Sequence, residues 1–207
     1  MVPAPVRPWA LRSRVRIGIA LAALLAVSGP PTADAQAGYT PSAFAISGPD
    51  PGEEAPDFAL PWATRDTVGD DLYSLGRDRG TVVVLAFYPR DFTRSDSIQL
   101  SRFRDEHSTL FGEGTVVLGI STDPVETHQR FAARLGLPFR LLSDPTQRVA
   151  GDYGSKDRDQ RNRRTVYVIG QDGRVAYRDL NFSAVEDKSY SRLARAVERA
   201  RKRGSSR

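Results

Sequence analysis

The chain has 207 residues, 27% of them charged, and a formal net charge of +5 at pH 7. It contains no cysteine, which excludes a thiol nucleophile, a disulfide and a cysteine-bound metal. Residues 1–35 hold four arginines and one acidic residue, and without them the net charge falls to +2. Since no recognised binding module or aromatic stacking pattern accompanies the remaining basic runs, we predict no nucleic-acid role.

The first 35 residues are typical of a secretory signal peptide. Their arginines precede an apolar run at 17–27, and Ala33-Asp34-Ala35 offers a small-x-small cleavage site. This run covers only about half of a bilayer's hydrocarbon core, which favours cleavage near Ala35 over retention as a short anchor. We therefore expect an exported protein, periplasmic or extracellular, that meets the membrane only through this segment during export.

Residues 36–51 are rich in glycine, proline, serine and alanine without a regular pattern, so they are predicted to form a flexible lead-in. One domain is expected over 52–203, followed by a disordered tail at 204–207. Within the domain, two nearly continuous β-branched runs at 81–88 and 115–120 predict central strands that are covered on both faces.

Helices are predicted between and after these strands. The first has apolar residues on a roughly helical spacing that Leu100 interrupts, namely Ile98, Phe103, His107, Leu110 and Phe111. The second is expected to be capped by Asp123, with Pro124 in its first turn and Glu126 completing a capping box. Gly136 is expected to end it.

The C-terminal part predicts a hairpin and a last helix. Strands over 165–169 and 174–180 flank a Gln-Asp-Gly turn at 171–173, a pattern that favours antiparallel pairing. A capping box of Ser183 and Glu186 predicts a helix from about residue 184, with a buried stripe of Tyr190, Leu193 and Val197. This alternation of strands and helices predicts an α/β fold with a mixed sheet.

Four stretches carry a family resemblance. They are GEEAPDFAL at 52–60, FYPRDFT at 87–93, GISTD at 119–123 with LPFRLLSDP at 137–145, and RTVYVI at 164–169. Their order and spacing resemble the peroxiredoxins (alkyl hydroperoxide reductase and thiol-specific antioxidant family), and most of all the bacterioferritin-comigratory or peroxiredoxin Q branch. The resemblance implies a thioredoxin-like fold, in which helices flank a central mixed β-sheet.

The resemblance also implies where the chemistry would lie. In the family a Pro-x-x-x-Thr-x-x-Cys motif opens a helix and an arginine arrives from a distant strand, so that the helix N-terminus and the cation favour the thiolate. Pro89, Thr93 and Arg164 match this pattern, but Asp96 stands in the place of the nucleophilic cysteine. Ser101 stands where the branch often has its resolving cysteine.

No catalytic residue, cofactor or metal is therefore assigned. A carboxylate does not attack a peroxide as a thiolate does, and Gln99 stands where a glutamate is common in the family. The two histidines, His107 and His128, belong to no metal-ligand spacing. The serines near the lost nucleophile have no evident base beside them; they are Ser95, Ser97 and Ser101.

Two interpretations of Asp96 stay open. In the first, function has drifted and an acid near a helix N-terminus contributes only a dipole interaction of about 0.3–1 kcal/mol. In the second, the carboxylate copies the charge and shape of a cysteine oxidised to sulfinate, paired with Arg164 and with the Thr93 hydroxyl.

Three functions are compatible with the sequence. We expect a peroxiredoxin-like protein without thiol peroxidase activity that binds a protein partner or a small ligand through the former active-site pocket. The alternative is an antioxidant oxidoreductase that reduces peroxide by a cysteine-independent mechanism. A structural or chaperone-like assembly, including a homodimer, is the third.

Overall fold

The computed structural model describes residues 48–157, 159 and 161–204. The predicted signal peptide, most of the lead-in and the last three residues lie outside these described residues. Within them, no helix combines the length and the apolar character that a membrane crossing requires. Arg178 holds the first described residues in place. It donates to the carbonyl oxygens of Gly48 and Pro49 and pairs with Asp50.

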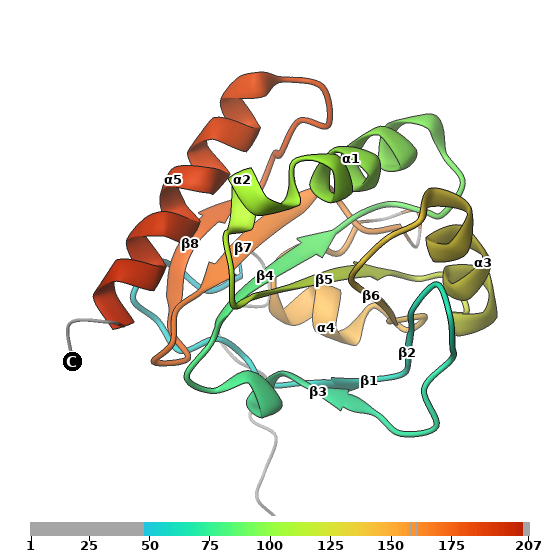
Figure 1. Ribbon diagram of the computed structural model, residues 1–207. Coiled ribbons are helices and arrows are strands. Elements are labelled where there is room, and N and C mark those ends of the chain that lie inside the picture. The colour runs from blue at the N-terminus through green and yellow to red at the C-terminus, as the bar shows by residue number, and fades with distance from the viewer. Residues whose placement is uncertain (1–47, 158, 160, 205–207) are drawn as a thin grey trace, which may run out of the picture. The chain divides into compact units, whose positions relative to one another are not determined.

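Six strands form the central sheet in the order β2-β6-β5-β4-β7-β8 (Figure 1). Their bounds are β2 Trp62–Ala63, β4 Val82–Phe87, β5 Thr115–Ser121, β6 Arg140–Ser143, β7 Thr165–Ile169 and β8 Val175–Asp179. Strands β4, β5 and β6 are parallel, whereas β2–β6, β4–β7 and β7–β8 are antiparallel pairs. The predicted mixed sheet and the predicted β7–β8 hairpin are therefore confirmed. A separate two-stranded sheet joins β1 Ala59–Leu60 to β3 Tyr73–Ser74, which precedes the 3-10 helix η1 Leu75–Asp78.

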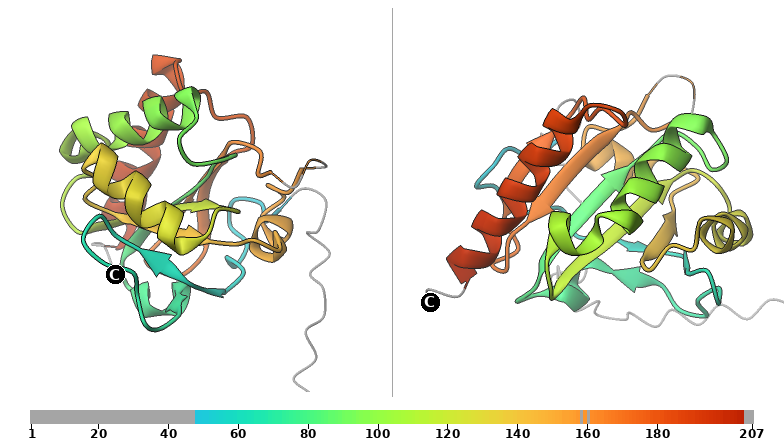
Figure 2. Two further views of the ribbon diagram at one scale, coloured as in Figure 1. Left: turned by 90° about the vertical axis from the view of Figure 1, so that its right-hand side faces the viewer. Right: turned by 45° about the horizontal axis from the view of Figure 1, so that its top comes forward.

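Helices cover both faces of the sheet (Figure 2). They are α1 Arg94–Asp105, α2 His107–Phe111, α3 Val125–Leu135, α4 Arg148–Asp152 and α5 Asp187–Gly204. Alternate residues of β4 enter two different cores: Val84 packs in the cluster that includes residues of α1, α3 and α5, and Leu85 in the cluster that includes residues of α4. Such alternation is what a central strand covered on both sides requires.

The helix predicted between the two central strands divides into α1 and α2, and its predicted buried face is partly wrong. Leu100 is fully buried, whereas Ile98 is 38% exposed. The reason is that polar Asp96 and Gln99 occupy the buried face of α1 together with Leu100 and Phe103. Apolar residues alone therefore do not trace the inward face of this helix.

Two predicted helix starts are corrected. Helix α3 begins at Val125 after Pro124, without a side-chain cap, because the Asp123 carboxylate accepts hydrogen bonds from Ser121 and Asp91 instead. Its end at a left-handed Gly136 is as predicted. Helix α5 begins at Asp187 rather than near residue 184, although the predicted stripe is buried, with Tyr190, Leu193 and Val197 at most 1% exposed.

Candidate functional site at the start of helix α1

The segment between β4 and α1 forms a tight entrance to the helix. Thr93 is the N-cap of α1, and its hydroxyl accepts a hydrogen bond from the backbone N–H of Asp96 at 3.2 Å. This bond satisfies one of the amides that a helix N-terminus leaves without an intrahelical partner. Just before it, Phe92 has a left-handed backbone with φ 59°, an uncommon conformation for an aromatic residue.

The Asp96 carboxylate is buried and surrounded by donors. Its Oδ2 accepts from the Thr93 hydroxyl at 2.5 Å and from the backbone N–H of Arg90 at 3.2 Å. Its Oδ1 lies 2.6 Å from Arg164 Nη2, an ion pair by distance whose angle falls outside hydrogen-bond geometry. Asp96 is only 1% exposed, so its charge is balanced by protein groups rather than by water.

Strand pairing brings Arg164 to this helix end from a distant part of the chain. Strands β4 and β7 are antiparallel with Phe87 opposite Thr165, which places Arg164 beside the residue where β4 ends and the chain turns into α1. Arg164 Nη1 also donates to the side-chain oxygen of Gln99, one turn further along α1. One guanidinium therefore holds two side chains of the same helix.

The structure brings together three of the residues singled out in the sequence: Thr93, Asp96 and Arg164. Pro89 lies in the loop beside them and is partly buried. Ser101 lies on a different face of α1, because five residues rotate a helix by about 140° beyond one full turn. Position 101 therefore does not share the Asp96 contacts.

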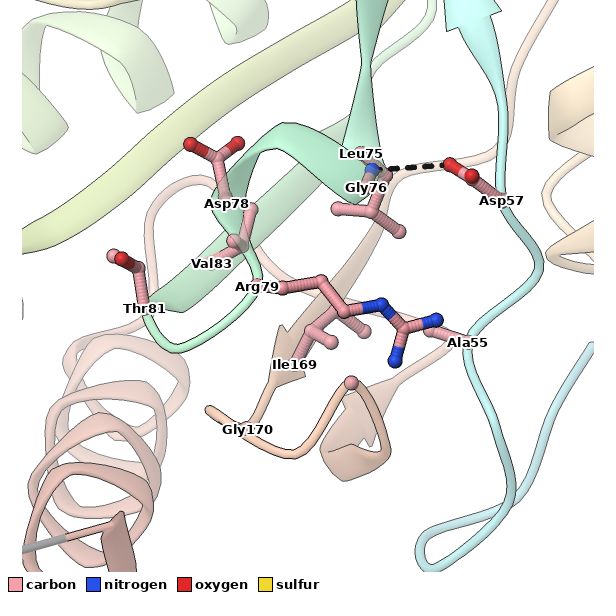
Figure 3. A pocket seen from close by; sticks show the side chains of 11 residues that line it. Ala55, Asp57, Leu75, Gly76, Asp78, Arg79, Thr81, Val83, Ile169 and Gly170 are labelled. Atoms are coloured by element: carbon pink, nitrogen blue, oxygen red, sulfur yellow. Dashed lines mark hydrogen bonds between the residues drawn. The ribbon is translucent and has the colours of Figure 1, made fainter.

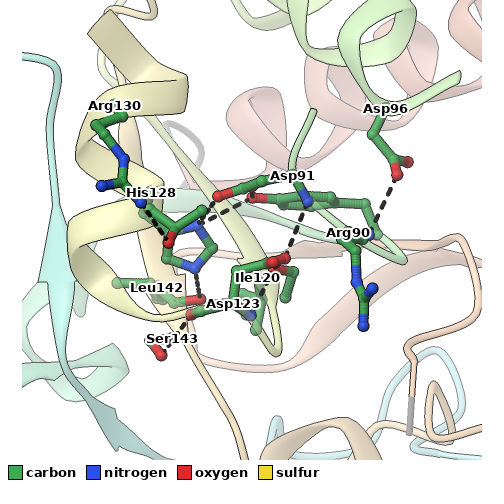
Figure 4. A network of polar contacts seen from close by, with 12 residues as sticks. Arg90, Asp91, Asp96, Ile120, Asp123, His128, Arg130, Leu142 and Ser143 are labelled. Carbon is green, nitrogen blue, oxygen red and sulfur yellow. Dashed lines mark hydrogen bonds and ion pairs between the residues drawn. The ribbon is translucent and has the colours of Figure 1, made fainter. Parts of the chain in front are cut away.

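A second buried carboxylate, Asp91, lies in the same segment (Figure 4). It accepts from the Tyr88 hydroxyl at 2.7 Å, and His128 Nδ1 lies 2.8 Å from its other oxygen. The second ring nitrogen of His128 contacts the carbonyl oxygen of Leu142 at 3.1 Å. Both ring nitrogens thus face oxygen atoms of the surrounding protein.

Asp123 extends this network toward β5 and β6. Its carboxylate accepts from the Asp91 backbone N–H at 2.9 Å and from Ser121 at 2.7 Å, and its carbonyl accepts from Ser143. Burial and the Asp91 carboxylate raise the pKa of Tyr88 well above its usual range. The network is a set of mutually satisfied polar groups, which is how buried polar side chains avoid a desolvation penalty.

Sequence reasoning missed this network, although polar residues beside apolar runs were a usable signal. His128 is not free to act as a base for the nearby serines, because both of its ring nitrogens are engaged in this network. Among the described residues, no group of three or more acidic or histidine side chains is arranged to hold a metal ion.

Two hollows lie elsewhere on the described part of the molecule. A cavity of about 30 Å³ is bounded by Asp57, Arg79 and Ile169 among others (Figure 3), which is room for little more than a water molecule. A wider groove of about 980 Å³ runs between the β7–β8 turn and the end of α5. Neither includes a residue of the Asp96 site.

The pattern of the AhpC/TSA family matches residues 51–178. The chain belongs to this family. The match includes every residue of the Asp96 site.

Individual peroxiredoxins agree with this assignment. A putative peroxiredoxin bcp of Coxiella burnetii is 38% identical over 132 residues, which cover 60% of this chain and 84% of the relative. A chloroplastic peroxiredoxin Q of Oryza sativa subsp. japonica is 35% identical over 128 residues, covering 61% of this chain and 57% of the relative. The crystal structure of a Xylella fastidiosa peroxiredoxin Q, a cysteine-to-serine variant, superposes with a TM-score of 0.64 at 23% identity, covering 74% of this chain and 99% of that one. The superposition shows a shared thioredoxin-like fold.

Proposed function

We propose that this chain is an exported, non-catalytic peroxiredoxin-like protein that binds a partner through the surface around the former peroxidase site. One observation carries the proposal. The Asp96 carboxylate accepts hydrogen bonds from the Thr93 hydroxyl and the Arg90 N–H, and it forms an ion pair with the Arg164 guanidinium. In the family pattern the threonine and the arginine contact the thiolate and the peroxide. Here the carboxylate occupies the place where that thiolate would react with the peroxide.

The contacts favour the interpretation of Asp96 as a copy of an oxidised cysteine. A carboxylate is planar and a sulfinate is pyramidal, but each is an anion with two acceptor oxygens attached to one CH₂ group. Asp96 uses one oxygen for Arg164 and the other for Thr93, as that interpretation requires. On this proposal the chain permanently holds the arrangement that a peroxidase reaches only after oxidation of its cysteine.

A partner would meet the rim of the site rather than Asp96 itself, which is buried. The rim carries Arg90 and Arg94, both exposed, and between them Phe92, which is 45% exposed. The Phe92 ring packs on Phe131 with centroids 4.9 Å apart, and the Arg134 guanidinium lies 5.9 Å from its centroid. Exposed aromatic and arginine side chains are the residue types enriched at the energetic centres of protein interfaces.

Peroxide consumption tests the loss of catalysis. The purified chain and its Asp96→Cys variant are incubated with hydrogen peroxide and excess dithiothreitol, beside Asp96→Ser as a variant of similar size without a thiol. We expect the wild type and Asp96→Ser to match a protein-free control and Asp96→Cys to consume peroxide. Consumption by the wild type would reject the proposal and support the cysteine-independent oxidoreductase, whose basis is the retained Pro89, Thr93 and Arg164.

Cross-linking in the producing host tests the binding role. We expect the double variant Phe92→Ser with Arg90→Glu to lose the cross-linked product that the exported wild-type chain forms with its partner. Val185→Ser is the matched control, because Val185 is an apolar side chain exposed by 69% in another part of the molecule. Equal cross-linking by both variants would exclude the rim as the binding surface.

The mass of the recovered chain tests export, since cleavage after Ala35 leaves Gln36 as its first residue.

A further inference from the structure

Gln99 is the least explained residue around Arg164. It is fully buried, and its side-chain oxygen accepts from Arg164 Nη1. A guanidinium only donates, so the amide oxygen must face it and the amide nitrogen must point away. That nitrogen is buried and has no hydrogen-bond partner. An unpaired buried donor is unfavourable.

A glutamate would remove this unpaired donor, because a carboxylate presents only acceptors. The amide is therefore worse than a carboxylate as a local hydrogen-bonding partner for Arg164. The reason for an amide at position 99 must therefore lie in a neighbouring residue.

The charge of Asp96 supplies that reason. Asp96 and Gln99 both contact Arg164, and both are at most 1% exposed. With an amide at 99, one buried carboxylate faces one guanidinium. With a carboxylate at 99, two buried carboxylates would share that single cation, an arrangement in which like charges disfavour each other's ionised form.

We infer that Gln99 is the charge-matching partner of Asp96, so that the two positions together present a single negative charge to Arg164. The charge stands at position 96, and the amide at 99 keeps the buried site neutral. Gln99 thereby positions the Arg164 guanidinium on the Asp96 carboxylate. This inference concerns the inside of the site and does not depend on whether a partner binds its rim.

Thermal unfolding of the full chain tests it with variants that change charge but hardly change shape. Gln99→Glu should lower the Tm by about 6–20 °C, as expected for an uncompensated buried charge in a chain of this size. The double variant Asp96→Asn with Gln99→Glu moves the charge from one position to the other and should recover at least half of that loss. Gln129→Glu, the same chemical change on a partly exposed residue of α3, should shift the Tm by less than about 2 °C.

The pH dependence separates charge from shape. The Tm deficit of Gln99→Glu should shrink as the pH falls from 7.5 to 5, because the added carboxyl group takes up a proton while it is buried beside Asp96. Around Arg164, Asp96 is present in both the wild type and the variant, and Tyr190 of α5, over whose ring Arg102 lies, has its pKa raised to about 12, chiefly by burial. A purely steric defect would leave the deficit constant.

Two outcomes would overturn the inference. One is a Gln99→Glu variant as stable as the wild type. The other is a double variant no more stable than the sum of its single changes predicts. If Asp96→Asn alone does not fold, Gln99→Glu and the double variant still decide the matter, since the inference requires the double variant to be the more stable of these two.

Discussion

Asp91 and Asp96 are two buried carboxylates in one short segment, at 4% and 1% exposure, and they relate differently to the family pattern. Asp91 is bonded by Tyr88 and His128, a network that ties β4, α3 and β6 together. Asp96 is bonded by Thr93 and Arg164, residues that in the resemblance serve a reactive cysteine. The comparison indicates that one carboxylate belongs to a polar network between strands and helices, whereas the other, on the proposal above, occupies the former reaction centre.

The Asp91 network should make the larger contribution to stability. His128→Ala leaves the buried Asp91 carboxylate without its imidazole partner and the Leu142 carbonyl without a donor. We expect a loss of roughly 3–5 kcal/mol in the free energy of unfolding, the range for breaking a buried pair. Urea unfolding followed by circular dichroism measures it. Phe131→Leu on the same helix controls for lost packing alone, and a loss no larger than in that control would show that the polar contacts of the network add nothing to stability beyond packing.

The smaller but more informative effect belongs to Asp96. Asp96→Ala removes the anion from Arg164 and Thr93, and because the Arg164 side chain is 15% exposed, some of the lost interaction is replaced by water. We expect a loss of about 3 kcal/mol, or about 6–12 °C in Tm. A helix-dipole interaction alone would give at most about 1 kcal/mol. The melting temperature therefore separates the two interpretations of this residue.

Formate sharpens the same measurement. The anion has the two oxygens that Asp96→Ala removes, so it should bind the exposed donors of Arg164 and Thr93 and raise the Tm of that variant more than it raises the Tm of the wild type. Chloride at the same ionic strength is the control for general salt effects. Equal shifts with both salts would mean that no anion cradle remains when the carboxylate is removed.

Sequence patterns predicted the elements better than the partners of the buried polar groups. The strand over 165–169 was placed with its observed bounds, because a continuous β-branched run specifies a covered strand locally. The predicted cap of Asp123 was wrong, because its carboxylate is taken by Ser121 and by Asp91, which is 32 residues away in the chain. The choice between a nearby cap and a distant partner depends on tertiary packing, which local patterns do not contain.

The candidate site likewise has contacts that the sequence predicted and contacts that only tertiary packing determines. The motif placed Thr93 and Asp96 together because both lie in one helical turn, and the resemblance added Arg164 from across the sheet. The Asp91–His128 pair joins residues 37 positions apart, and no spacing rule in one sequence connects them. The role of Gln99 needed the orientation of its amide, which only the packed structure supplies.

High pH should weaken the molecule by the smallest amount, and mainly outside the Asp96 site. Burial raises the pKa of all six tyrosines in the described part of the chain, to about 12 for Tyr167, Tyr177 and Tyr190. The folded state holds protons that the unfolded state starts to release as the pH approaches 10, so this contribution is complete at pH 8, is partly lost by pH 10 and falls further as the pH rises through the folded-state pKa values. Several of these side chains are partly exposed, so we expect a fall of only about 1–2 kcal/mol between pH 8 and pH 10.

Absorbance at 295 nm during the same titration tells which tyrosines ionise. Tyr88 should be among the last, because the Asp91 carboxylate beside it adds to the effect of burial. His128→Ala is expected to lose more stability than Asp96→Ala, so its tyrosinate formation should become linked to unfolding at a lower pH than in Asp96→Ala, where the Tyr88 contacts are intact. Identical titrations of the two variants would mean that the Asp91 network and the Asp96 site unfold as one unit, and the distinction between the network and the former reaction centre would then fail.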